Sequence, residues 1–187
     1  FLGQDFALRG GGTFGEEQHA LFGEVTYDFS PRWTIGIGAR WLEEDVYIQF
    51  DDLEGFLAPA SSGFAAEDSV SEFNPSAYLQ FRPVPTTTLY LQAARGFRSA
   101  QPNQPLPESC QEEAAVVGLG PISDPDTLWN YEIGSKSTFA GGKVSANLAL
   151  YRSQWDGVQL ASSLTCGFNG TLNGGDVRFD GFSAAAS

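Results

Sequence analysis

Apolar side chains recur at every second position along most of this chain, and this period of two constrains the fold more than any other feature. From Trp33 to Leu42, one face of an extended strand would carry only apolar side chains, and the other face only small or polar ones until the final leucine. A helix would need a period near 3.6, so the alternation predicts β-strands. The predicted strands are Ala20–Phe29, Trp33–Leu42, Pro75–Arg82, Thr88–Phe97, Leu128–Phe139 and Val144–Tyr151, with a weaker seventh at Asp176–Ser183 and the remnant of an earlier one at Phe1–Arg9.

The links between these segments alternate strictly between short and long. The short links are Ser30-Pro31-Arg32, Pro83–Thr87 and Gly141-Gly142, and the long ones are Glu43–Glu72, Ser99–Thr127 and Ala161–Gly175. In a meander, alternate links lie at opposite ends of the sheet, so all the long loops are expected at one end. The fold class is therefore predicted to be all-β, an antiparallel up-and-down meander of about six to eight strands over residues 1–187.

Charge and composition exclude several kinds of protein. The two loops Glu43–Glu72 and Ser99–Thr127 carry nine and five acidic residues and no Lys or Arg. A net charge of -13 with only 10 Lys and Arg argues against nucleic acid as a partner, because phosphate binding needs a basic face. No apolar run approaches the ~20 residues that a membrane-spanning helix needs. The start, Phe1-Leu2-Gly3-Gln4-Asp5, does not resemble a signal peptide, and we expect both ends to be cuts in a longer protein.

The division of the two faces bears on the solvent around the sheet. A soluble sandwich would bury the apolar face, whereas an outer-membrane barrel turns that face to lipid and lines its lumen with the polar one. Strands of about eight to twelve residues match the ~9–11 that a tilted transmembrane strand needs. The large aromatic residues lie near segment ends, as in the interfacial girdles of such barrels. These features favour a partial slice of a transmembrane β-barrel, with a soluble carbohydrate-binding β-sandwich as an alternative.

Four motifs resemble those of TonB-dependent receptors, in the order of that family. Ala20–Asp28 is similar to a strand that runs into a short turn, and Leu89–Ser99 to a tyrosine-containing strand that ends in Gly-Phe-Arg. Trp129–Ser137 resembles a strand with Glu, Gly and Lys at alternate positions, and Asn173–Val177 the start of the strand that follows. The resemblance implies a 22-stranded barrel around a plug domain, and this chain would be roughly a third of that barrel.

The resemblance also implies a function, namely TonB-dependent, energy-coupled uptake of a scarce solute such as a ferric siderophore, cobalamin or a sugar across the bacterial outer membrane. This chain would supply barrel wall and extracellular loops, and TonB would act through the plug domain, which has no counterpart in this sequence. Outer-membrane lipid and lipopolysaccharide would be further partners, and the ligand would be a small molecule. We expect no enzymatic reaction and no cofactor. Alternatives are a passive porin or a small self-contained barrel, and an enzyme carried on outer-membrane strands; for the enzyme we find no nucleophile or paired acids, and His19 is the only histidine.

Polar and charged side chains on the polar face are the candidate lumen residues, namely Glu24, Arg40, Tyr78, Arg82, Tyr90, Glu132 and Lys136. The four that carry charge near mid-strand, Glu24, Arg40, Glu132 and Lys136, are expected to pair with one another across strands, or else to contact the plug or the substrate. Arg95, Phe97 and Arg98 are expected at the extracellular rim. There the two arginines would meet either lipopolysaccharide phosphates or solvent.

Two cysteines lie in two of the long loops. Cys110 follows the fourth predicted strand and Cys166 follows the sixth, so the meander places both at the same end, one hairpin apart. Neighbouring strands lie ~4.8 Å apart, so such loops can meet, and an extracellular site permits disulfides. We predict a Cys110–Cys166 bridge; the alternative is two unpaired thiols.

Overall fold

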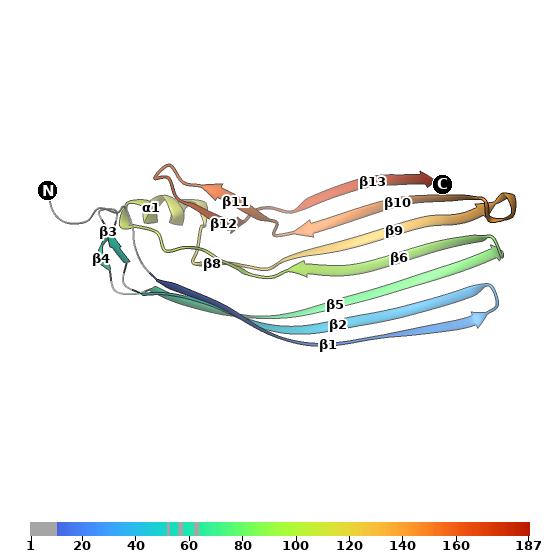
Figure 1. Ribbon diagram of the computed structural model, residues 1–187, viewed down its shortest axis with the longest axis horizontal. Helices are drawn as coiled ribbons and strands as arrows, with labels where there is room; N and C mark the ends of the chain where they lie inside the picture. The colour runs from blue at the N-terminus through green and yellow to red at the C-terminus, as the bar shows by residue number, and fades with distance from the viewer. Residues whose placement is uncertain (1–10, 52, 56–57, 62–63) are drawn as a thin grey trace.

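A single antiparallel sheet of seven long strands makes up most of the computed structural model, which describes residues 11–51, 53–55, 58–61 and 64–187. The sheet order is β1-β2-β5-β6-β9-β10-β13, so each long strand pairs with the next long strand along the chain (Figure 1). This confirms the expected all-β meander.

The elements are β1 Gly12–Ser30, β2 Trp33–Phe50, β3 Leu53–Gly55, β4 Ala58–Ser61, β5 Phe64–Val84, β6 Thr87–Arg98, β7 Gln101–Pro102, α1 Glu108–Val117, β8 Ile122–Ser123, β9 Asp126–Phe139, the 3₁₀ turn Ala140–Gly142, β10 Val144–Asp156, β11 Gln159–Ser163, β12 Asn169–Asn173 and β13 Val177–Ala186.

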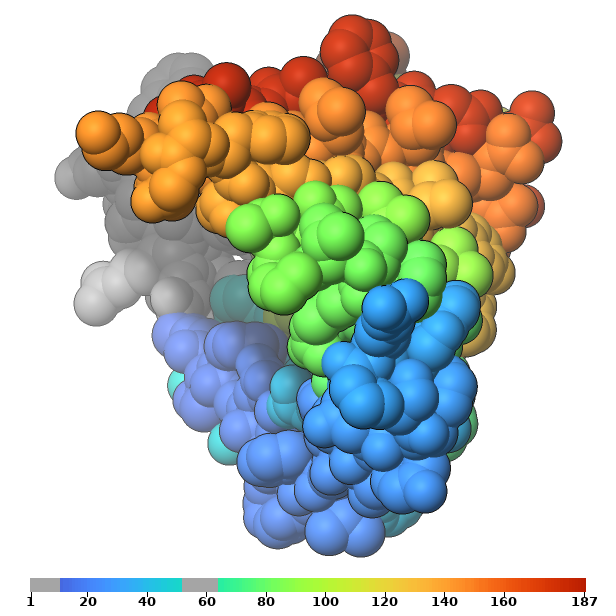
Figure 2. All heavy atoms as spheres, turned by 90° about the vertical axis from the view of Figure 1, so that its right-hand side faces the viewer, coloured from blue at the N-terminus to red at the C-terminus, as the bar shows by residue number. Residues whose placement is uncertain are grey.

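Short and long connections lie at opposite ends of the sheet. The turns β1–β2, β5–β6 and β9–β10 are at one end, and β3, β4, α1, β11 and β12 gather at the other (Figure 1). The β9–β10 turn depends on two glycines, because Gly141 and Gly142 adopt φ values of 67° and 88° that side chains other than glycine rarely adopt. The sheet is open, with β1 and β13 at its opposite edges, at the bottom and top of Figure 2.

The strand register gathers apolar residues on one face of the sheet, called here the apolar face. One cross-strand row consists of Tyr27, Ile35, Leu79, Leu91, Ile133, Leu150 and Phe182. Large members of this face are well exposed, with Leu91 at 53%, Leu150 at 62% and Phe182 at 77%. In the described part of the chain the remaining sheets are two-stranded and none covers this face. The arrangement is therefore not the two-sheet sandwich that was the soluble alternative.

The strands β1, β2 and β5 each extend by eight or more residues past the predicted segments toward the long loops. β2 runs to Phe50 and β5 begins at Phe64, so much of Glu43–Glu72 is strand, and predicting a long loop there was wrong. Beyond Trp41 the two faces exchange character. Glu43 and Asp45 point outward and are exposed, while Leu42, Val46 and Ile48 on the other face are at most 7% exposed. The period of two continues beyond Trp41, but the many acidic residues in this segment led to its interpretation as a loop.

The other two long loops also contain regular structure. Ser99–Thr127 holds the helix α1 and the paired strands β7 and β8, and Ala161–Gly175 holds most of the hairpin β11–β12. In the described ranges no helix has the length and apolar character needed to span a membrane. The segment Phe1–Arg9, interpreted as the remnant of a strand, lies outside the described residues.

Candidate functional site

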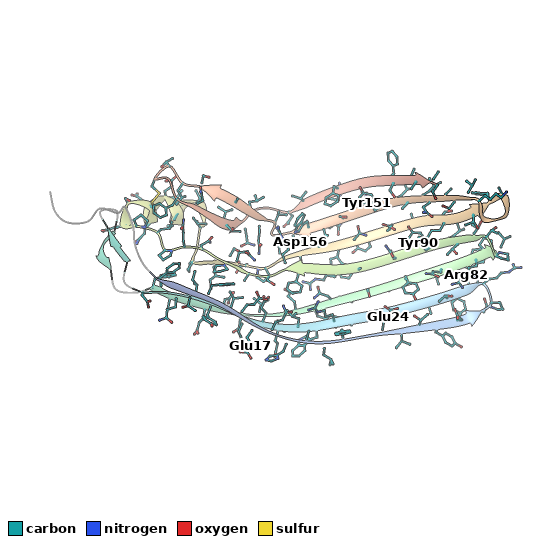
Figure 3. All side chains as sticks on the ribbon, in the orientation of Figure 1. Glu17, Glu24, Arg82, Tyr90, Tyr151 and Asp156 are labelled. Carbon is teal, nitrogen blue, oxygen red and sulfur yellow. A yellow bond between two sulfur atoms is a disulfide. The ribbon has the colours of Figure 1, made fainter. Side chains whose placement is uncertain are left out.

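The face opposite the apolar one, called here the polar face, carries all seven candidate lumen residues. Its central row consists of Thr26, Gly36, Tyr78, Gln92, Glu132, Tyr151 and Gly181. The neighbouring row, one step closer to the short turns, consists of Asp28, Thr34, Gln80, Tyr90, Gly134, Ala149 and Ser183. Glu24, Arg40, Arg82 and Lys136 lie in neighbouring rows of the same face. Figure 3 labels Glu24, Arg82, Tyr90 and Tyr151 along the sheet.

The rings of three tyrosines on the polar face lie over glycines of an adjacent strand. Tyr78 faces Gly36, Tyr90 faces Gly134, and Tyr151 faces Gly181 in the register. A Cβ added at each glycine would lie 2.2, 2.4 and 2.3 Å from the opposing ring, respectively, which no side chain tolerates without moving the tyrosine. Because glycine has no Cβ, each tyrosine ring can lie over its glycine, and this contact sets the position of the three phenol groups on the polar face.

Hydrogen bonds then orient two of these phenol groups. Tyr90 donates to Glu132 Oε1 at 2.6 Å, and the Tyr78 hydroxyl lies 3.0 Å from Thr26 Oγ1. Lys136 Nζ lies 5.3 Å from the centre of the Tyr90 ring. Tyr90 therefore contacts both the Glu132 carboxylate and the Lys136 ammonium group, which do not contact each other.

The expected pairing of Glu24, Arg40, Glu132 and Lys136 with one another was wrong. None of the four forms an ion pair among the residues that the structure describes. Glu132 and Lys136 are four residues apart on one strand, which separates them by about 13 Å. Arg40 instead donates to Gln18 Oε1 at 3.2 Å.

An open cavity of about 640 Å³ lies over the polar face between β1 and β6. Its lining includes Glu24, Arg40, Asn74 and Ser76. The amide nitrogen and oxygen of Asn74 are both buried and have no hydrogen-bond partner in the described residues. The lining of the cavity therefore brings together a carboxylate, a guanidinium and a buried carboxamide without a hydrogen-bond partner in the described residues.

The two long loops that carry the cysteines form one unit, defined here as residues 99–125 and 157–176 and called the loop unit. Cys110 and Cys166, the predicted pair, are joined by a disulfide with their Cα atoms 5.8 Å apart. The buried side chain of Asn103 donates to the carbonyls of Gly120 and Thr171, both at 2.8 Å, and accepts from the Thr171 N–H at 2.7 Å. Glu113 accepts three hydrogen bonds from Thr165, and these lower the pKa of its carboxyl.

A buried carboxylate anchors the loop unit to the sheet. Asp126, at 1% exposure, accepts from Arg98 Nε at 3.0 Å and from the Gln159 N–H at 2.9 Å. Burial alone would raise the pKa of Asp126, but the hydrogen bonds from Arg98 and Gln159 outweigh it and the pKa is lowered. The Arg98 guanidinium also lies 4.7 Å from the centre of the Trp155 ring. One side chain therefore holds β6, β9 and the start of β11 together.

Replacing this anchor should loosen the loop unit. We expect Asp126→Asn to lower the free energy of unfolding by about 2–3 kcal/mol, because the Arg98 guanidinium loses its anion while still keeping some contact with water. The effect should be complete above the unfolded pKa of the carboxyl and should fade as the pH falls through the lower folded pKa. Denaturant titration of the refolded receptor measures the change. Asp124→Asn, an exposed carboxyl two residues away, is the matched control, and an equal loss there would contradict the assignment.

Both rim arginines have carboxylate partners that sequence analysis did not anticipate. Arg95 directly follows the last β5–β6 register pair, which joins Ser76 to Ala94. Its guanidinium donates to Glu72 Oε2 and to the Phe73 carbonyl, both at 2.6 Å. Arg98 is bound to Asp126. Neither charge is therefore free for a lipopolysaccharide phosphate or left to solvent alone. Phe97 lies in register with Thr127 on the apolar face.

Glu44 is the other buried acid of this region. Its side chain is 1% exposed between Leu42 and Val46, and neither carboxylate oxygen has a hydrogen-bond partner among the described residues. The strand β7 of the loop unit packs against β2 here. Burial raises the pKa of Glu44, the nearby Glu16 carboxylate adds to the rise, and the Ser99 hydroxyl opposes it.

This burial predicts a pH dependence in how the loop unit rests on β2. An acid whose folded pKa is raised stabilises the folded contact while it is protonated, and that stability falls as the pH rises from the unfolded pKa toward the folded one. We expect Glu44→Gln to remove the dependence and to slow amide exchange at Asn103 at neutral pH, because the amide side chain carries no charge that burial disfavours. Glu43→Gln, on the exposed side of β2, should change nothing, and a pH dependence that survives in Glu44→Gln would refute the role of Glu44.

The polar groups of the site are of kinds that suit the binding of a ligand. Within the described ranges no group of three or more His, Cys, Asp and Glu side chains could hold a metal ion. The polar face offers hydroxyl, carboxamide, carboxylate and cationic groups spread over a broad wall.

Sequence analysis missed Tyr151, Asp126 and Asn103. The recurrence of a tyrosine opposite a glycine in neighbouring strands would have identified Tyr151, whereas the other two depend on loop contacts that carry no local pattern.

Almost the whole chain matches the model of one protein family. The model described as "TonB dependent receptor-like, beta-barrel" matches residues 4–187. The chain belongs to this family. It is therefore a slice of a receptor barrel of the bacterial outer membrane, and the expected fold and location are confirmed.

Individual relatives of the receptor chain are distant and much longer. A curated relative, the probable TonB-dependent siderophore receptor PiuA of Acinetobacter baumannii, is 21% identical over 156 residues, which cover 83% of this chain and 19% of PiuA. The solved structure of the ferric yersiniabactin uptake receptor FyuA from Yersinia pestis matches with a TM-score of 0.76 at 17% identity, over 96% of this chain and 25% of FyuA. The solved PiuA structure matches with a TM-score of 0.66 at 17% identity, over 92% of this chain and 23% of that one. At these identities the structures show a shared fold.

Proposed function

We propose that this chain forms the wall and extracellular loops of a receptor that imports a ferric siderophore by TonB-dependent transport. The observation that carries the proposal is the two-faced sheet of a TonB-dependent receptor barrel, apolar and uncovered on one side and lined on the other by tyrosine, carboxylate and amide groups. PiuA and FyuA, whose names describe siderophore receptors, supply the substrate class.

In this proposal the apolar face meets lipid. On β2 it extends from Trp33 to Trp41, about 26 Å of strand and roughly 20 Å of membrane thickness at a tilt near 40°, comparable to the ~25 Å apolar band of such barrels. Aromatic residues mark its borders, with Trp33 stacked on Phe81 at 4.4 Å near the short turns and Trp129 on Tyr131 at 5.8 Å nearer the loops. The acidic outer side of the β2 extension would then lie outside the membrane.

The polar face lines the lumen and meets the plug domain or the passing ligand. Glu24, Arg40, Tyr78, Arg82, Tyr90, Glu132 and Lys136 are the residues that we assign to this wall, and Tyr151 joins them. The loop unit stands at the extracellular mouth above it. TonB would act through the plug, and the ligand would be a small molecule.

Uptake of labelled iron by cells tests this function. Cells that lack their own siderophore receptors and carry the full-length receptor should accumulate iron from a panel of ferric siderophores, ferric yersiniabactin among them, only when TonB is present. Uptake that is equal with and without TonB would favour the passive porin instead. Failure with every ferric siderophore, combined with TonB-dependent uptake of cobalamin or a sugar, would retain the transport class and replace the substrate.

A further inference from the structure

Two arginines occupy the loop-side border of the apolar face on the last two strands. Along β10 the apolar residues Leu148 and Leu150 give way to Arg152, and along β13 Phe182 gives way to Asp180 and then Arg178. Arg152 pairs with Asp180 in the register and donates to it through Nε at 2.6 Å and Nη2 at 3.3 Å. Both side chains remain exposed, at 53% and 55%.

This border differs from the rest of the chain in charge. At the corresponding border of β1 and β2 the outward residues beyond Leu21 and Trp41 are His19, Glu17, Glu43 and Asp45, three of them acidic. Arg95 and Arg98, which lie closer to the sheet centre, are neutralised by Glu72 and Asp126. Arg178 forms no ion pair in the described part of the chain, so the Arg152, Asp180 and Arg178 cluster carries one net positive charge in a protein of net charge -13.

We propose that Arg152 and Arg178 bind the phosphate of a phosphorylated lipid headgroup in the outer leaflet. The proposal rests on the proposed function for one point, that the apolar face meets lipid. A guanidinium matches phosphate geometry through paired N–H donors, and Asp180 orients Arg152 while leaving donors of its guanidinium unused. Tyr131 lies beside Arg152 in the register and stacks on Trp129, and aromatic rings of this kind sit at the level of lipid headgroups.

Binding of lipid A to the full-length receptor in detergent tests this site. We expect the double variant Arg152→Gln with Arg178→Gln to bind lipid A about tenfold more weakly, as measured by retention in native mass spectrometry across a lipid titration. The matched control is Arg32→Gln with Lys143→Gln, which removes the same charge from two exposed turn residues at the other end of the sheet. The control should bind lipid A as the unaltered receptor does, and dephosphorylated lipid A should bind weakly to all three proteins.

Several results would overturn the proposal. These are unchanged binding in the double variant, an equal loss in the turn control, equal binding of dephosphorylated lipid A, and competition by inorganic phosphate at the concentrations where lipid A binds. Failure of the proposed function has a different signature, because it appears as absent TonB-dependent uptake by the unaltered receptor. Lipid binding in detergent does not depend on that uptake.

Discussion

Leu91→Arg is expected to lower the free energy of unfolding of the full-length barrel by roughly 2–4 kcal/mol, the cost of a charged side chain near the midplane of a membrane barrel. Leu91 lies at the centre of the apolar row, between Leu79 and Ile133, and is 53% exposed. An arginine there has no carboxylate within its row, so its charge would meet lipid. Denaturant titration of the receptor folded into vesicles measures the loss.

The neighbouring position gives a matched control. Gln92 pairs with Tyr78 and Glu132 on the polar face, so Gln92→Arg places the same charge one residue away, beside a carboxylate. We expect a change below about 1 kcal/mol there, because the side chain remains in a polar environment. Equal losses at the two positions would contradict the assignment of lipid and lumen faces, while a loss only at Gln92→Arg would reverse it.

The period of two was sufficient to predict the sheet. Within the predicted segments each strand keeps one apolar and one polar face, so local alternation reports the fold directly and the six main strands lie where the pattern placed them. The alternation of short and long links predicted the order of the strands. All seven polar-face candidates share one face because a register slip by one residue would move every side chain to the other side.

The pattern failed where environment changes along one strand. Past Trp41 the inner positions Leu42, Val46 and Ile48 are apolar and buried, on a strand that β7 of the loop unit contacts, and the outer positions become acidic. The sequence Glu43-Glu44-Asp45 was therefore interpreted as loop, although its neighbours still alternate. In the proposed orientation this part of β2 lies outside the membrane, where both of its faces meet a different environment and change composition accordingly.

Specific partners were the least predictable part of the site. Glu132 bonds to Tyr90 and not to Lys136, and Arg98 bonds to Asp126, because register and strand spacing decide which charges meet. The contacts inside the loop unit join residues far apart in the chain, such as Asn103 and Thr171. No periodic signal in the sequence encodes them, whereas the two cysteines marked the same two loops.

Loss of the Cys110–Cys166 disulfide should produce the other large effect, confined to the loop unit. The bridge spans a sequence separation of 56 residues, and the chain-entropy model then gives a stabilisation of about 4 kcal/mol. Cys110 is fully buried in a small apolar cluster with Ala114, Leu119 and Leu164, so the bridge also holds α1 against β11–β12. We expect the variant Cys110→Ser with Cys166→Ser to expose amides of α1 and β12 to hydrogen exchange, with protection reduced by up to about a thousandfold.

The seven-stranded sheet should keep its protection in the same experiment, because its ladder does not pass through the bridge. Reductant should reproduce the loop effect in the unaltered receptor and have no further effect on the double serine variant, which separates the disulfide from damage elsewhere. Thiol labelling without reductant should find neither cysteine reactive. Two reactive thiols in the intact receptor, or unchanged exchange in α1 after reduction, would mean that the hydrogen bonds of Asn103 and Glu113 hold the loop unit together without the bridge.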